Sequence, residues 1–150
     1  MIEQVYMQIL GLLADSPYHQ NWSAEDLETY IDTPIKLNQF VLGGNDDDSL
    51  FFFATFAHPE EAHIQEYLRT GTFPVDGYYA NGKDVWIVDF ICLGGVRDIT
   101  VSFRCLKNLL SSMGHTQCFW LRTNKNKIGF HILKEWGMGG GGGGGGSSYD

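Results

Sequence analysis

The chain has 150 residues, a formal net charge of −8 at pH 7 and 43% hydrophobic residues. This length favours one domain with a modest core. No segment approaches the roughly 20 consecutive apolar residues of a membrane-spanning helix, which argues against an integral membrane protein. Polar residues interrupt the first apolar stretch and no basic leader precedes it, so we expect a cytoplasmic protein without a signal peptide.

The cysteines argue against some kinds of site, and the distribution of charge indicates a kind of binding partner. Cys92, Cys105 and Cys118 are odd in number and lack CxxC spacing, which favours buried free thiols over disulfides or structural zinc. Residues 1–96 hold three Lys or Arg and fifteen Asp or Glu, a net −12, whereas residues 97–150 hold seven and three, a net +4. The basic residues 97–150 favour an acidic protein partner, not a nucleic acid. Alternatively, these Lys and Arg residues lie on a solvent-exposed helix face, which would produce the same excess of positive charge.

The first third of the chain predicts two helices. Residues 2–14 carry apolar side chains at helical spacing, and Pro17 ends this helix because the residue before a proline is pushed out of the helical region. Ser23 and Asp26 form a capping-box pattern that begins a short second helix. Thr33-Pro34 is predicted to close it.

A β-hairpin is predicted next. Its strands cover residues 35–42 and 49–57, and a Gly- and Asp-rich turn over 43–48 joins them. The three consecutive aspartates of this turn lack the glycine and the distal glutamate of a calcium-binding EF-hand, so we predict no metal site there.

The rest of the chain alternates helices and strands. The predicted order is a helix from Pro59 to Thr70-Gly71, a loop over 72–84, a strand over 85–92, a helix carrying Ile99 to Met113 and ended by Gly114, a strand over 117–122, and a strand or helix over 128–136. Residues 1–138 then form an α+β domain with a mixed sheet whose central strand is 85–92. Residues 139–150 are predicted to be a flexible Gly-rich tail.

Two polar residues stand out against this background. His19 lies in the turn between the first two helices, and Asp89 lies in the apolar strand 85–92. Burying an ionised carboxylate costs several kcal/mol unless it is paired. An imidazole is a natural partner, because the carboxylate fixes its tautomer and raises the basicity of the other nitrogen. Alternatively, Asp89 pairs with Arg122 or with backbone N–H groups, and His19 caps a helix end.

The other histidines are weaker candidates. His58 and His63 are five residues apart, which is not the i, i+4 spacing of a ligand pair. His115 follows a helix-stop glycine, and His131 lies in the undecided last element. The GxSxG and P-loop motifs are absent from the sequence.

Three segments stand out together, which are Ser16–Trp22 (SPYHQNW), Pro34–Phe40 and Trp86–Ile91. In their order and spacing they resemble the toxin-activating lysine acyltransferases that fatty-acylate RTX haemolysins. The resemblance extends over about residues 5–130. It implies a GNAT-like fold, with a mixed and mostly antiparallel sheet flanked by helices. It also implies an acyl-acyl carrier protein as donor and internal lysines of an RTX-type protoxin as acceptors.

The resemblance also implies roles for single residues. It makes His19 the catalytic base and Asp89 its partner, and it assigns oxyanion or substrate positioning to Ser16, Asn38 and Gln39. An acyl-histidine intermediate uses the same residues and stays open as a second route. Because acyl carrier protein is acidic, we expect it to dock on the basic end of the chain. The candidate docking residues are Arg97, Arg104, Lys107, Arg122, Lys125 and Lys127.

No bound cofactor is expected, because the Leu93–Arg97 segment is not the pyrophosphate-holding loop of coenzyme-A-dependent relatives. The resembling family usually continues with a further C-terminal segment, whereas this chain passes into glycines. A non-catalytic GNAT-like structural or interaction protein of a phage or mobile element is therefore the alternative. The oligomeric state stays open, with a homodimer among the possibilities.

Overall fold

A computed structural model of the chain describes residues 2–16, 19, 21–44, 50–93, 96–122 and 127–132. The predicted aspartate-rich turn, Lys125 and the predicted tail over 139–150 lie outside the described residues. The chain divides into two compact units, of which unit 1 comprises residues 1–55 and 89–104, and unit 2 comprises residues 56–88 and 105–150. Each unit is described by itself, and the single domain over 1–138 stays a prediction.

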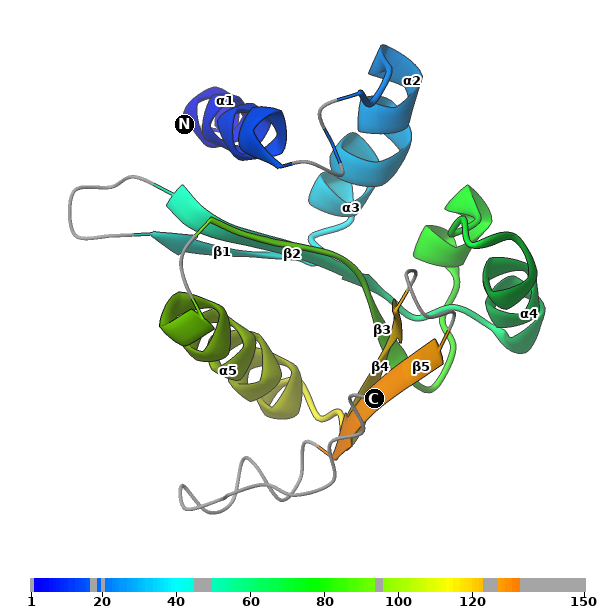
Figure 1. Ribbon diagram of the computed structural model, residues 1–150. Coiled ribbons are helices and arrows are strands. Elements are labelled where there is room, and N and C mark those ends of the chain that lie inside the picture. The colour runs from blue at the N-terminus through cyan, green and yellow to red at the C-terminus, as the bar shows by residue number, and fades with distance from the viewer. Residues whose placement is uncertain are drawn as a thin grey trace. The chain divides into compact units, whose positions relative to one another are not determined.

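The elements in chain order are α1 (Ile2–Asp15), α2 (Ala24–Leu27), the π-helical turn η1 (Glu28–Asp32), α3 (Thr33–Lys36), β1 (Phe40–Gly44), β2 (Leu50–Ala57), α4 (Glu61–Thr70), the 3-10 helix η2 (Val75–Tyr79), β3 (Val85–Cys92), α5 (Val96–Ser112), β4 (Gln117–Arg122) and β5 (Lys127–Ile132) (Figure 1). The hydrogen-bonded order of the strands is β1-β2-β3-β4-β5. The β1–β2 and β4–β5 pairs are antiparallel, and β3–β4 is parallel. This confirms the predicted α+β class with a mixed, mostly antiparallel sheet.

The strand predicted over residues 35–42 is wrong in its first half, because the helix continues through Thr33-Pro34 to Lys36. The Thr33 N–H donates to the carbonyl of Glu28, five residues back, and the Thr33 hydroxyl donates to the same oxygen at 3.1 Å. This wider turn places Pro34 at the start of α3, where a missing N–H leaves no hydrogen bond unmade. Helix α3 ends at Lys36 with Leu37 as its C-cap, and Asn38 just after the cap has a left-handed φ of 60°.

Other boundaries differ less. Helix α4 begins at Glu61 with Glu60 as its N-cap, so Pro59 precedes the cap and does not occupy the predicted first helical position. Gly71 ends α4 in the left-handed conformation, as predicted. The predicted loop over 72–84 contains η2, and the undecided last element forms the strand β5.

Unit 1 is a layer of helices on one face of its strands. Buried side chains of α1 and η1 pack against Phe53 of β2 and Ile91 of β3. Because side chains alternate along a strand, Asp89 lies on the same face as Ile91. Phe90 lies on the other face, where its ring contacts Phe52 and Phe103, at 5.2 and 5.4 Å between centroids. In Figure 1, α1 and the beginning of α5 lie on opposite sides of these strands.

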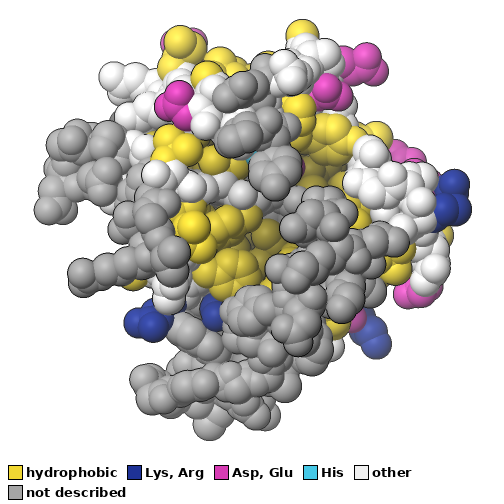
Figure 2. All heavy atoms as spheres, viewed as in Figure 1, with side chains coloured by type: hydrophobic (Ala, Val, Ile, Leu, Met, Phe, Trp, Pro, Cys, Tyr) yellow, Lys and Arg dark blue, Asp and Glu magenta, His cyan; other side chains and the backbone are white. Residues whose placement is uncertain are grey.

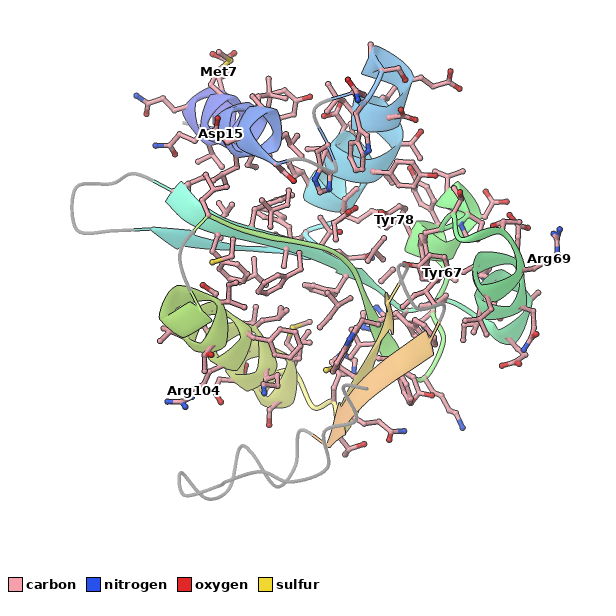
Figure 3. All side chains as sticks on the ribbon, in the orientation of Figure 1. Met7, Asp15, Tyr67, Arg69, Tyr78 and Arg104 are labelled. Atoms are coloured by element: carbon pink, nitrogen blue, oxygen red, sulfur yellow. The ribbon has the colours of Figure 1, made fainter. Side chains whose placement is uncertain are left out.

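Unit 2 has an aromatic core. Tyr67 of α4 contacts the rings of Phe73 and Trp86 edge-on, at 5.2 and 6.1 Å, and Trp86 stacks on Phe119 of β4 at 5.4 Å. Figure 3 shows Arg69 pointing away from α4 on the side opposite to Tyr67, so α4 has one buried and one solvent-facing side. No helix within the described ranges is long and apolar enough to cross a membrane.

Candidate active site

Ser16, His19 and Asp89 form a continuous hydrogen-bonded chain in unit 1. The Ser16 Oγ lies 2.6 Å from His19 Nδ1, and His19 Nε2 lies 3.3 Å from Asp89 Oδ1. Ser16 and His19 are only 6% and 8% exposed, and the Asp89 side chain is 17% exposed. The predicted pairing of His19 with Asp89 is therefore present in the structure.

Local backbone structure holds these side chains in place. Past the end of α1, the Ser16 N–H donates to Leu13, and the His19 N–H donates in turn to the carbonyl of Ser16 at 3.0 Å. This turn brings the two side chains onto one side of the chain. On β3, the Asp89 N–H donates to the hydroxyl of Thr55, a fully buried residue of β2, at 3.2 Å. Thr55 thus fixes the backbone of Asp89, a role that the sequence did not reveal.

The two hydrogen bonds decide the protonation of the ring. An ionised carboxylate only accepts, so the Nε2 that faces Asp89 carries the hydrogen. In the neutral imidazole, Nδ1 is then the basic nitrogen, and it accepts the Ser16 hydroxyl. While this bond is made, Ser16 cannot donate the same hydrogen to an oxyanion. A role of Ser16 toward the oxyanion or the substrate stays a prediction.

Two aromatic rings border the dyad. The Trp22 ring meets the His19 ring edge-on at 4.6 Å between centroids, and it lies 5.5 Å from the ring of Tyr30 in η1. Burial, followed by the charges of Asp26 and Asp89, raises the pKa of the Tyr30 phenol. Tyr30 is thus held neutral within the electrostatic reach of the Asp89 carboxylate.

The remaining predicted positioning residues lie just past α3. Asn38 is exposed and occupies the left-handed position that ends the helix, and its N–H donates to the carbonyl of Ile35. The Gln39 N–H donates to the carbonyl of Pro34 at 2.8 Å. These backbone bonds explain why an Asn fits here, because Asn tolerates a positive φ. A role of Asn38 or Gln39 toward a substrate stays a prediction.

The predicted docking residues differ in exposure, and the structure describes the side chains of only some of them. Arg104 is exposed on α5 (Figure 3). Lys107 is only 6% exposed, and its role in docking stays a prediction. The side chains of Arg97, Arg122 and Lys127, like all of Lys125, lie outside the part of the chain that is described.

The three cysteines differ in their burial. Burial raises the pKa of the Cys118 thiol to about 12, so it stays protonated at neutral pH. Cys92 is half-buried, with its sulfur 3.7 Å from the hydroxyl of Ser102. Cys105 is exposed, which differs from the predicted burial of all three thiols.

A pair of histidines that the sequence did not single out meets in unit 2. The Nε2 atoms of His58 and His115 lie 3.0 Å apart, and the rings stack at 4.9 Å between centroids. Desolvation by burial lowers the pKa of both rings; the charge of His115 lowers that of His58 further, whereas Asp84 partly offsets the effect at His115. Their separation of 57 residues leaves no local sequence signal for the contact.

Comparison with known families finds a match over most of the chain. The model of the HlyC family, described as the RTX toxin acyltransferase family, matches residues 3–136. That span includes all three residues of the Ser16–His19–Asp89 chain. No curated protein matches the sequence.

Proposed function

Since the chain belongs to the RTX toxin acyltransferase family, we propose that it transfers a fatty acyl group from acyl-acyl carrier protein to internal lysines of an RTX-type protoxin in the cytoplasm. The observation that supports this most directly is the Ser16–His19–Asp89 chain, with its basic nitrogen bonded to a hydroxyl. Acyl transfer to an amine needs such a base.

The acceptor must lose a proton before it reacts. A lysine ammonium has a pKa near 10.4, so at pH 7 almost none is nucleophilic. We assign the proton to His19 Nδ1, with the Ser16 hydroxyl as a relay. The Ser16 oxygen accepts a proton from the lysine ammonium while the hydrogen of the Ser16 hydroxyl moves to His19 Nδ1. Asp89 then faces an imidazolium, whose positive charge it stabilises across the 3.3 Å contact. The Ser16 hydroxyl thus extends the reach of a nearly buried imidazole.

The acyl transfer itself forms one bond and breaks one bond. The lysine nitrogen attacks the thioester carbonyl carbon, a C–N bond forms, and the C–S bond breaks. The imidazolium returns the proton to the departing thiolate of the carrier's pantetheine arm. The developing oxyanion needs N–H donors other than the Ser16 hydroxyl, and Asn38, Gln39 and nearby backbone groups are the candidates.

A covalent route has one specific observation in its favour. The order of hydroxyl, imidazole and carboxylate is that of a Ser-His-Asp nucleophilic triad, although the two ring nitrogens exchange their usual partners. An acyl-Ser16 or acyl-His19 intermediate would accumulate when donor is mixed with enzyme without acceptor. Direct transfer leaves the enzyme unlabelled under the same conditions, so intact-protein mass spectrometry separates the two routes.

The test of the proposal is transfer of labelled acyl groups from acyl-acyl carrier protein to a purified RTX-type protoxin. We expect lysine labelling with the wild type and its loss in His19→Ala. His63→Ala is the matched control, because His63 caps the exposed beginning of α4 and should leave transfer unchanged. Absence of transfer with every acyl length, in a folded wild type, would favour a non-catalytic interaction protein instead.

A further inference from the structure

Two aromatic residues near the Ser16–His19 pair are more exposed than the pair itself. Ser16 and His19 are almost completely buried, whereas Trp22 and Tyr30 are half-buried. A substrate that approaches the pair from the side of Trp22 and Tyr30 meets these two aromatic rings first. Their chemistry decides what kind of group is received there.

The geometry of the two rings suits a ligand that contacts ring faces. Trp22 and Tyr30 lie 5.5 Å apart between centroids with 50° between their planes. A flat stack would hide one face of each ring, whereas this tilt does not. Trp22 contacts His19 at 65° between planes, so the indole links the outer ring to the base.

The charge around the rings is negative. From His19 to Ile35 the sequence has four acidic residues, Glu25, Asp26, Glu28 and Asp32, and no Lys or Arg. Figure 2 shows acidic side chains over the α2 end of this layer. Asp26 and Asp89 both act on the Tyr30 phenol, so negative charge lies within reach of the aromatic pair. Such surroundings favour a cation and disfavour an acidic carrier protein.

We propose that Trp22 and Tyr30 form the subsite that receives the side chain of the acceptor lysine. The ring faces bind the incoming ammonium by cation–π interaction and its methylene chain by packing, with Asp89 as the nearby countercharge. From there the ammonium passes its proton to the Ser16 hydroxyl. The inference rests on the proposed lysine acyltransfer, and it assigns the acceptor, not the acyl chain, to this side of unit 1.

The first test measures binding without any donor. The probe is a ten-residue peptide with one central lysine, titrated by NMR against the full chain, alongside a peptide with norleucine in place of the lysine. We expect norleucine to weaken binding, and Trp22→Leu and Tyr30→Leu each to weaken lysine-peptide binding about fivefold or more. Trp22→Phe and Tyr30→Phe keep a ring and should give smaller losses. Tyr79→Leu removes a 65% exposed ring of unit 2 and should leave binding unchanged.

The second test separates acceptor from donor in the transfer reaction. Trp22→Leu should raise the KM for the acceptor about fivefold or more and leave the KM for acyl-acyl carrier protein within twofold. A rise in the donor KM alone would assign the rings to the acyl chain and overturn the inference. Equal lysine-peptide binding by wild type and Trp22→Leu would also overturn it, even with transfer intact. Lysine-selective binding that needs the rings, in a protein without transfer activity, would uphold the subsite and reject the acyltransferase.

Discussion

Replacing Asp89 with Asn tests whether the charge of this carboxylate is needed, because Asn keeps nearly the same shape. The amide oxygen still accepts from His19 Nε2, so the neutral resting state is preserved. The negative charge that would face the imidazolium is lost. Two unit charges at the 3.3 Å separation attract by about 5 kcal/mol at an effective dielectric constant of about 20.

Solvent reduces this value, since the Asp89 side chain is 17% exposed. We therefore expect a loss of about 2 to 4 kcal/mol, which lowers kcat about 30- to 1,000-fold. The KM for acyl-acyl carrier protein should change little, because the imidazolium exists only after proton transfer.

The assay is initial-rate transfer from acyl-acyl carrier protein to an RTX-type protoxin, with thermal unfolding as the control for folding. Asp76→Asn, an exposed carboxylate of η2, is the matched control and should keep the wild-type rate. A folded Asp89→Asn enzyme with kcat within about threefold of wild type would show that His19 works without the carboxylate charge, and it would contradict the expected electrostatic effect.

Three further predictions concern the rest of the molecule. Ser16→Ala removes the 2.6 Å bond to His19 Nδ1 and should lower kcat about 10- to 100-fold; an unchanged rate would exclude the relay. Folding lowers the pKa of His58 and His115. The folded state should therefore have its full stability above the unfolded-state pKa of about 6.5 and lose stability as the pH falls below that value. The loss should be less than about 1.4 kcal/mol per pH unit for each proton, because both rings are half-exposed. Urea unfolding from pH 8 to 5 measures this, and His58→Gln should flatten the fall. Gly82→Ala would bring a Cβ within 2.2 Å of a backbone carbonyl oxygen, so its melting temperature should drop by several degrees, whereas Gly11→Ala, with open space, should not.

Much of the secondary structure follows from local pattern. The strands over 85–92 and 117–122 were predicted with the bounds that β3 and β4 have, because an apolar run between turn residues is a strong strand signal. The Ser23–Asp26 capping box is also present as predicted. The helix through Pro34 was not predicted from the sequence, because a proline alone indicates the end of a helix. The helix continues here because a π-helical turn, with a hydrogen bond from Thr33 to Glu28 five residues back, accommodates the proline.

The sequence by itself determined that Asp89 needs a partner, since an acid inside an apolar strand requires one, and it left His19, Arg122 and backbone N–H groups as the candidates. Only the tertiary structure decided that Asp89 faces Nε2, that Ser16 occupies Nδ1 and that Thr55 holds the backbone of Asp89. The physical reason is that propensity, capping and alternation act between neighbours in the chain. Which atom faces which across 70 residues is set by how helices and strands pack, and no local pattern encodes that choice.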